Sequence, residues 1–398
     1  MGPIGVYVHF PWCLKKCPYC DFVSFARERE QIDHEGYADA VIAELEVRRE
    51  ALAGRPLASV FFGGGTPSLW EPRALGRVLR AVLDAADTRG EAADAEREVE
   101  ITVECNPTSL DEARARALVD VGVNRVSIGV QGLDPERLRF LGRLHDPGGG
   151  LAAVEAALRA GVPRVSADLI YGVATEKGAP GAEETVAEAL RLVATGITHL
   201  SAYSLTIEPG TQFGELARRG RLPIAPDDGV AETFFALEAA LEAEGLSHYE
   251  ISNYARPGAE SIHNLGYWRG HDYLGLGCAA FGTLGRVDGS AVRYRNITDP
   301  SRYMERARAY RGAGLLESDE ALDPEARLRE RIMLGLRLRD GLDLDDAASE
   351  LGVPAWSAER SRAADRLVAS GRLTRDGSRL RVPPAARVYA DGIAAALF

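Results

Sequence analysis

The sequence predicts an α/β fold, in which a partial (β/α)6 TIM-like barrel is followed by a helical, winged-helix-like C-terminal domain. Over the first half, strand-like and helix-like runs alternate through six units, as in a parallel sheet with helices outside it. Near the C-terminus, three helical runs lead into a hairpin signal. Glycines and unusual polar residues follow the predicted barrel strands, where functional groups of such barrels lie.

The six barrel units are predicted in order along the chain. Short runs rich in Val, Ile, Phe and Tyr predict the strands, and runs with apolar residues at helical spacing predict the helices. The expected strands cover residues 6–9, 59–62, 100–104, 125–129, 166–170 and 199–203. The expected helices cover 36–53, 71–86, 111–121, 135–141, 151–160 and 183–194. We expect loops at 145–150, where an Asp-Pro step precedes three glycines, and at the acid-rich segment 88–98.

The alternation stops near residue 209. An amphipathic helix is expected over 225–245, and a stretch rich in Gly and aromatic residues follows over 248–295. Helices are expected over 324–338, 344–351 and 357–370, and the Asp376-Gly377 step predicts a hairpin within 372–382. We therefore predict a barrel over 1–210, a barrel extension over 211–320 and a winged-helix-like domain over 321–398.

Composition narrows the class of protein. The chain has 398 residues and a net charge of −12. The negative charge argues against a protein that binds nucleic acid or an anionic membrane, since either partner needs a basic surface. A mild excess of Arg in the last segment is interpreted as a solvated face. No run approaches the roughly 18 apolar residues of a membrane span. The start resembles no secretion signal, so we expect a cytoplasmic location.

Three of the five cysteines lie within eight residues, at Cys13, Cys17 and Cys20. An odd, clustered set indicates metal binding in a reducing compartment rather than disulfides. A structural zinc site needs a fourth protein ligand, which Cys105 or His9 could supply. Three thiolates on a four-iron cluster would instead leave one iron open to a substrate or cofactor.

The Cys-x3-Cys-x2-Cys spacing, with an aromatic before the third Cys, resembles the radical S-adenosylmethionine (radical SAM) superfamily. The resemblance implies a [4Fe-4S] cluster on the three cysteines, with S-adenosylmethionine (SAM) on the open iron. Reduction then cleaves SAM to methionine and a 5′-deoxyadenosyl radical. In the family, a glycine motif after the second strand contacts the methionine amino group, and Gly63-Gly64-Gly65-Thr66-Pro67 stands there. The remaining SAM contacts that the resemblance implies are Tyr7, Tyr19, Glu104, Gln131, Arg143, Asp168, Thr206 and Phe281.

Further motifs resemble the oxygen-independent coproporphyrinogen III oxidase group, over essentially the whole chain. They include Tyr7-Val8-His9-Phe10-Pro11-Trp12-Cys13 and Glu104-Cys105-Asn106-Pro107. The oxidases usually carry a fourth Cys two residues after the third, where this chain has Phe22. The segment His263-Asn264-Leu265-Gly266-Tyr267-Trp268 matches the motif of HemW-type haem chaperones in this group. That match implies His263 as a haem-iron ligand, which suits a neutral imidazole.

We therefore expect a haem chaperone that carries a [4Fe-4S] cluster and SAM, binds haem and passes it to an acceptor protein. An electron donor such as a flavodoxin or ferredoxin would reduce the cluster, and nucleic acid is not expected as a partner. No catalytic residue is assigned. The alternatives are an oxygen-independent coproporphyrinogen III oxidase, which would make the chain an enzyme, a related radical SAM methyltransferase, and a zinc-stabilised α/β protein.

Overall fold

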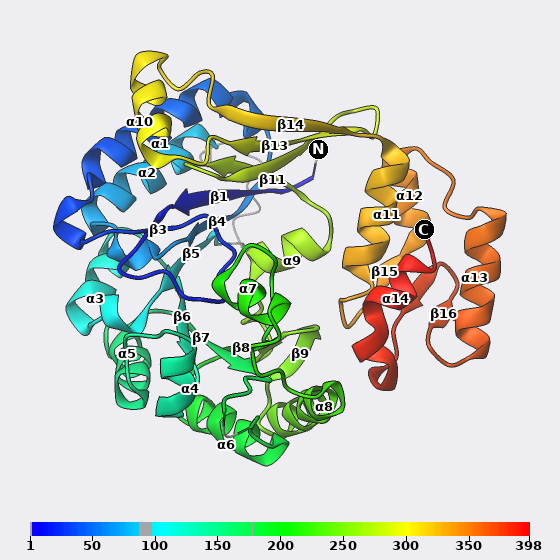
Figure 1. The fold of residues 1–398 in the computed structure, drawn as a ribbon. Helices are drawn as coiled ribbons and strands as arrows, with labels where there is room; N and C mark the ends of the chain where they lie inside the picture. The colour runs from blue at the N-terminus through cyan, green and yellow to red at the C-terminus, as the bar shows by residue number, and fades with distance from the viewer. Residues whose placement is uncertain (1, 87–97, 177) are drawn as a thin grey trace.

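A computed structural model describes residues 2–86, 98–176 and 178–398. Its main feature is a twelve-stranded mixed sheet that curves into an open arc, with helices on its outer side (Figure 1). The strand order is β14-β13-β12-β11-β1-β4-β5-β6-β7-β8-β10-β9. Among the described residues, no pairing joins β14 to β9, so the sheet forms a barrel that is open on one side.

Six parallel strands form the predicted barrel units, and they lie where the sequence predicts them. Their bounds are β1 Ile4–Phe10, β4 Leu57–Gly64, β5 Glu100–Cys105, β6 Arg125–Gln131, β7 Arg164–Tyr171 and β8 His199–Ser204. Their apolar side chains belong to one large core with the surrounding helices. These helices are α1 His34–Arg48, α2 Pro72–Ala85, α3 Glu112–Asp120, α4 Pro135–Phe140, α5 Pro147–Arg159 and α6 Ala182–Val193.

The loop prediction for 145–150 is wrong for its second half, because α5 begins at Pro147. The Asp146 carboxylate caps the helix by accepting from Gly149 N at 2.7 Å, and a proline at the first helical position has no N–H to leave unpaired. A Cβ on Gly150 would lie 2.9 Å from Val130 Cγ1, so the glycine lets α5 approach β6. In the other predicted loop, residues 88–97 lie outside the described residues.

The sheet continues on both sides of the six strands. Next to β8 lie β10 Asn253–Ala255 and β9 Ser247–Glu250, both antiparallel to their neighbours. Next to β1 lies β11 Asp272–Leu276, which is parallel to it and was not predicted. Beyond it are antiparallel strands β12 Phe281–Gly285, β13 Ala291–Asn296 and β14 Leu316–Leu322. The remaining helices here are α7 Gln212–Arg218, α8 Asp227–Ala243, α9 Ile262–Trp268 and α10 Pro300–Ala309.

The C-terminal part has its own core, formed by buried residues between Leu328 and Leu397. Its elements follow a winged-helix-like order: α11 Pro324–Gly335, β15 Leu342–Asp343, α12 Leu344–Leu351, α13 Ala358–Ala369, β16 Thr374–Asp376, β17 Arg379–Arg381, the 3-10 helix η5 Pro384–Tyr389 and α14 Ala390–Ala395. The predicted hairpin is present, and Gly377 turns it with a φ of 61°. The domain faces the open side of the barrel (Figure 1). The boundaries 1–210, 211–320 and 321–398 stay a prediction.

No helix among the described residues has the length and apolar character needed to span a bilayer.

Candidate functional site

The cysteine loop follows β1 and is closed by backbone pairing. Strand β2, Trp12–Cys13, pairs with β3, Phe25–Ala26, and Arg27 N donates to Cys13 O at 2.8 Å. Within the loop, Cys20 N donates to Cys17 O at 3.2 Å. The chain between Cys13 and Cys20 is thereby held as one compact turn that carries three free thiols.

The chemistry of these thiols fits a metal centre. Burial and the neighbouring thiols raise the pKa of Cys20 to about 11, and burial also raises the pKa of Cys13. Thiols with raised pKa values are poor thiolates without a cation, whereas a bound metal deprotonates them outright.

The two other cysteines and His9 are engaged elsewhere. Cys105 Sγ lies 3.5 Å from Val103 O, and Cys278 Sγ lies 3.2 Å from Thr298 O. His9 Nε2 lies 2.8 Å from Val23 O. Burial lowers the pKa of His9 to about 4. Neither candidate for the fourth ligand of a zinc site is therefore free in this arrangement.

The glycine segment after β4 is locked against the cysteine loop. Gly65 N donates to Phe10 O at 2.7 Å and Thr66 N donates to Trp12 O at 2.8 Å. A Cβ on Gly65 would lie 2.6 Å from Trp12 O, so only glycine permits this approach. Gly64 has a φ of 106°, which also favours glycine. The cysteine loop and the glycine segment are therefore held together as one structural unit.

Two half-buried carboxyl groups lie on strands that are separated only by β6: Glu104 is near the end of β5, and Asp168 is within β7. Gly64 N donates to Glu104 Oε2 at 3.1 Å, and Ser127 Oγ donates to Asp168 Oδ1 at 3.0 Å. Burial, and then the charge of Asp168, raise the pKa of Glu104 to about 8. Burial also raises the pKa of Asp168, against the hydrogen bonds from Ser201 and Ser127. A cationic ligand such as an ammonium or sulfonium group would relieve this repulsion.

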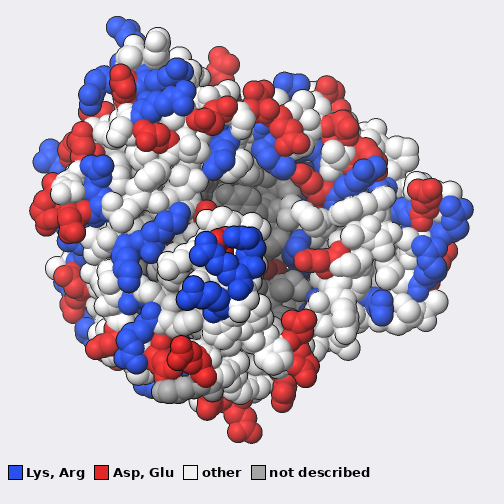
Figure 2. Space-filling view, in the orientation of Figure 1, with Lys and Arg blue, Asp and Glu red and all other residues white. Residues whose placement is uncertain are grey.

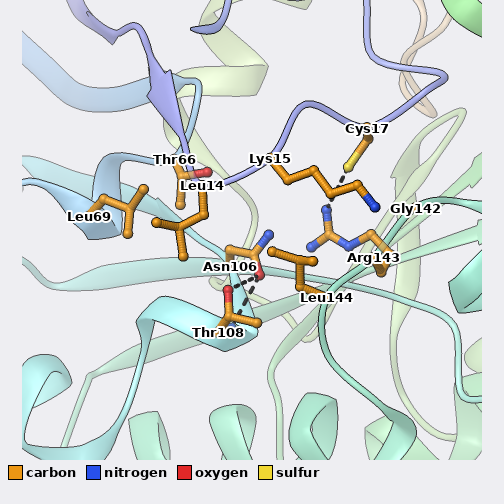
Figure 3. Close-up of a pocket in the computed structure, with 10 residues that line it drawn as sticks. All are labelled: Leu14, Lys15, Cys17, Thr66, Leu69, Asn106, Thr108, Gly142, Arg143 and Leu144. Atoms are coloured by element: carbon orange, nitrogen blue, oxygen red, sulfur yellow. Dashed lines mark hydrogen bonds between the residues drawn. The ribbon is translucent and has the colours of Figure 1, made fainter. Parts of the chain in front are cut away.

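Arg143 lies between the cysteine loop and β6. Its Nη2 donates to Gly129 O at 2.7 Å, and its Nη1 lies 3.5 Å from Cys17 Sγ (Figure 3). Its Nε and the Oε1 of Gln131 are buried, and neither has a hydrogen-bond partner among the residues that the structure describes. Gln131 also has a φ of 68°, a strained value for a residue other than glycine. Unsatisfied groups and strain of this kind are typical of a site that receives a polar ligand.

A pocket joins these segments (Figure 3). It is lined by the cysteine loop, by Thr66, by the 3-10 helix η4 Pro107–Ser109 with the preceding Asn106, and by residues 142–144. Asn106 Oδ1 accepts from Thr108 N and Thr108 Oγ1 at 3.2 and 3.0 Å. Asn106, Thr108 and Lys15 were not predicted as site residues, since a single capping Asn or a surface Lys carries no signal in sequence.

Of the predicted SAM contacts, Thr66 and Arg143 line this pocket, whereas Tyr7, Tyr19, Thr206 and Phe281 are not among its lining residues. Tyr19 packs on Phe213 of α7 with ring centroids 6.3 Å apart. The Tyr7 hydroxyl donates to His9 Nδ1 at 3.0 Å, because the neutral His9 ring donates its proton from Nε2 to Val23 O. Thr206 follows β8 and is exposed. Phe281 begins β12, with the Arg295 guanidinium 5.1 Å from its ring centroid.

His263 is buried on α9 at the inner side of the barrel, with 4% of its surface exposed. Its Nδ1 lies 2.8 Å from Ser59 Oγ, while its Nε2 is buried without a partner. Phe61 stacks on the ring at a centroid distance of 4.8 Å. Burial lowers the pKa of His263 to about 3, so the ring is neutral. With the proton on Nδ1, Nε2 has a free lone pair, as a ligand to iron requires.

Sequence reasoning missed the two residues that hold His263. Ser59 fixes the ring, and the Oε1 of buried Glu100 accepts from His263 N at 3.0 Å and from Ser261 Oγ at 3.3 Å. A carboxylate at a helix N-terminus stabilises it. Both residues are ordinary at a strand start, so nothing in the sequence points to this role.

A second cavity, the lateral cavity, lies on the open side of the barrel. Its volume is about 680 Å³, and it is lined by residues of β8–β13, α9 and α11. Asn264, Tyr267 and Trp268 of the predicted haem motif are in its wall. Tyr267 also contacts His263, with ring centroids 4.8 Å apart. Figure 2 shows this face hollowed between the barrel and the C-terminal domain.

Comparison with known proteins identifies the family. Residues 7–180 match the radical SAM superfamily and residues 322–389 match the HemN C-terminal domain. A protein of Mycobacterium tuberculosis H37Rv named heme chaperone HemW is 35% identical over 393 residues, which cover 98% of this chain and 94% of the relative. The heme chaperone HemW of Escherichia coli K12 is 37% identical over 307 residues, or 77% of this chain and 76% of the relative.

A solved structure agrees on the fold. The radical SAM enzyme coproporphyrinogen III oxidase (HemN) of Escherichia coli matches with a TM-score of 0.79 at 20% identity, covering 100% of this chain and 90% of the other. The predicted fold class is thereby confirmed. From the identity and coverage of its relatives, this chain belongs to the HemW family of the radical SAM superfamily.

Proposed function

We propose that this protein is a haem chaperone, which binds haem through His263 and transfers it to an acceptor protein. The observation that carries the proposal is the neutral, buried His263 ring, fixed by Ser59 and with Nε2 unpartnered. The names of its relatives support haem as the cargo. A neutral imidazole is a good axial ligand.

Cys13, Cys17 and Cys20 would hold a [4Fe-4S] cluster, and SAM would bind between this cluster and the carboxyl groups of Glu104 and Asp168. When bound, the cluster supplies an electron to SAM, delivered by a donor such as a flavodoxin or ferredoxin. Glu104 and Asp168 would attract the cationic groups of SAM, and Arg143 would pair with its carboxylate. Tyr7 lies against Phe61, at a centroid distance of 6.2 Å, and against His263, at 6.4 Å, so it links the two sites. Free thiols on this loop support a reducing compartment such as the cytoplasm.

The experiment is a haem titration of the purified, anaerobically reconstituted protein, followed by the Soret absorbance. We expect wild type to bind haem with an axial-imidazole spectrum that His263→Ala loses. His34→Ala is the matched control, since His34 begins α1 and is not among the residues that line the lateral cavity. An unchanged spectrum in His263→Ala, with the control also unchanged, would remove His263 as the ligand.

A second assay addresses the enzymatic alternative. The reconstituted protein is incubated with coproporphyrinogen III, SAM and a reductant, and carbon dioxide is measured. We expect none above background, because Phe22 stands where the oxidases usually carry a fourth cysteine. Stoichiometric carbon dioxide would overturn the chaperone assignment.

A further inference from the structure

The lateral cavity has the size and lining of a site for a flat, aromatic molecule. Its volume of about 680 Å³ lies within the roughly 300–1,000 Å³ of small-molecule sites. Much of the wall is aromatic or apolar: Tyr203, Tyr267, Trp268, Tyr273, Met333 and Leu334. Rings of this kind pack on a planar π-system with a large contact area.

The charged part of the wall is basic, although the chain as a whole is acidic. Arg293, Arg327, Arg331 and Arg337 line the cavity, against the two acids Glu250 and Glu330. Arg293 is held by Glu330 through two 2.8 Å hydrogen bonds. Arg327 donates to Gly289 O at 3.0 Å and lies 3.5 Å from Asp272. These two arginines are already fixed by the protein.

Arg331 and Arg337 are different, because their carboxylate partners are in solvent. Arg331 Nη1 lies 2.6 Å from Glu350, whose side chain is 63% exposed, and Arg331 Nε is buried without a partner. Arg337 Nη2 lies 2.6 Å from Asp391, which is 80% exposed. Because the carboxylates are in solvent while the arginines are 16% and 22% exposed, another carboxylate can replace them at little cost.

Arg337 contacts the haem motif, and Arg331 lies beside the residue Gly270 that follows it. The Arg337 guanidinium lies 5.6 Å from the Trp268 ring centroid. A Cβ on Gly270, two residues after Trp268, would lie 3.0 Å from Arg331 Nε. The segment that carries Arg337 is fastened to the barrel, since Arg339 N donates to Tyr249 O at 3.0 Å. Arginines from the C-terminal domain are therefore held against the motif of the barrel.

We infer that the lateral cavity binds the porphyrin ring of the haem, with Arg331 and Arg337 of the C-terminal domain pairing with its two propionate carboxylates. This inference rests on the proposed function. It assigns to the C-terminal domain the recognition of the propionate groups at the edge of the haem. The planar guanidinium matches a carboxylate in a bidentate pair. A tetrapyrrole without free carboxylates would lose these pairs.

The test compares haemin with haemin dimethyl ester, in which both propionates are blocked. Wild type is expected to bind haemin about a hundredfold more tightly than the ester. Arg331→Met and Arg337→Met are expected to weaken haemin binding by about tenfold each and to leave ester binding unchanged, so that the double variant no longer discriminates. The matched control is Arg329→Met on the same helix, which is 53% exposed and lies 3.5 Å from Glu325.

The outcomes separate the two proposals. If wild type binds haemin and its ester equally, the inference is overturned even if the variants fail to fold. If wild type binds neither, the proposed function itself fails. Haemin binding that depends on His263 but not on the propionates leaves the chaperone role intact and removes only the role of Arg331 and Arg337.

Discussion

Glu238 of α8 and Arg387 of η5 form an ion pair across the junction between the barrel and the C-terminal domain, and their side chains are only 12% and 10% exposed. His248 of β9 lies next to the pair, with Nδ1 3.9 Å from Glu238 Oε1. Burial, Arg387 and Arg339 lower the pKa of His248 to about 3, so this ring stays neutral. Arg387 is therefore the cation that balances a buried carboxylate between the two domains.

Arg387→Met should loosen the docked C-terminal domain. The variant leaves the Glu238 carboxylate buried without a cation. Breaking a buried ion pair in this way lowers the free energy of unfolding by about 3–5 kcal/mol. Hydrogen exchange should accelerate in α8 and η5 relative to wild type. Arg218→Met removes an exposed pair with Glu215 and should shift stability by no more than about 1 kcal/mol. Equal exchange in the two variants would show that the pair does not hold the domains together.

Replacing any one of Cys13, Cys17 and Cys20 by Ala should abolish the brown chromophore after anaerobic reconstitution. Each thiolate is one of only three protein ligands proposed for the cluster. Iron and sulfide are quantified per chain. Cys105→Ala and Cys278→Ala should keep wild-type iron, because both thiols are bonded to backbone carbonyls. Iron that persists in the three single variants, or zinc in place of iron, would contradict the assignment.

Glu104→Gln should stabilise the protein at alkaline pH. The folded-state pKa of about 8 lies above the unfolded value, so the folded state binds more protons between about pH 4.5 and 8 and loses stability as pH rises through this window. The variant escapes this loss and can still accept from Gly64 N. We expect no difference from electrostatics at pH 4 and a gain on the order of 2–4 kcal/mol at pH 9, measured by urea unfolding.

The control for this experiment is Glu155→Gln on the exposed face of α5, where Glu155 pairs with Arg159 at 3.4 Å. Its stability difference from wild type should be small at both pH values. A gain for Glu104→Gln that does not grow between pH 4 and pH 9 would mean that Glu104 is ionised at neutral pH.

Arg360→Met should destabilise the C-terminal domain. The guanidinium is 2% exposed and donates to Leu397 O and Ala355 O at 2.8 Å, besides pairing with Glu325 at 2.8 Å. Two carbonyls lose their donor, at a cost of about 1–3 kcal/mol each if they stay buried. Calorimetry should show a lower unfolding temperature for this domain in Arg360→Met. The control variant Arg362→Met, at an exposed position on the same helix, should have the unfolding temperature of wild type. Coincident transitions in the two variants would count against this role.

The sequence predicts the six barrel units, the cysteine loop and the glycine segment because each depends on local pattern: apolar periodicity, Asx caps or a tight spacing. The place of Glu104 and Asp168 at one end of the sheet also follows, since parallel strands bring their carboxyl ends together. The start of α5 was missed because glycines in its first turn disguise the Asp146 cap.

Other features depend on distant partners and leave no local signal. Strand β11 is five residues long and contains a Gly, so only its pairing with β1 defines it. Ser59 and Glu100 serve His263 from positions 204 and 163 residues away. The arginines of the lateral cavity belong to a domain whose docking against the barrel cannot be inferred from either segment alone.

The gap between β14 and β9 makes the barrel accessible from its side as well as from the end where the cysteine loop lies. The cysteine loop follows β1 at the carboxyl ends of the parallel strands, whereas the lateral cavity opens at the side, against α11 of the C-terminal domain. Haem bound in this cavity would be transferred to another protein without passing the oxygen-sensitive iron–sulfur cluster. Haem transfer and SAM cleavage would then take place on different sides of one protein.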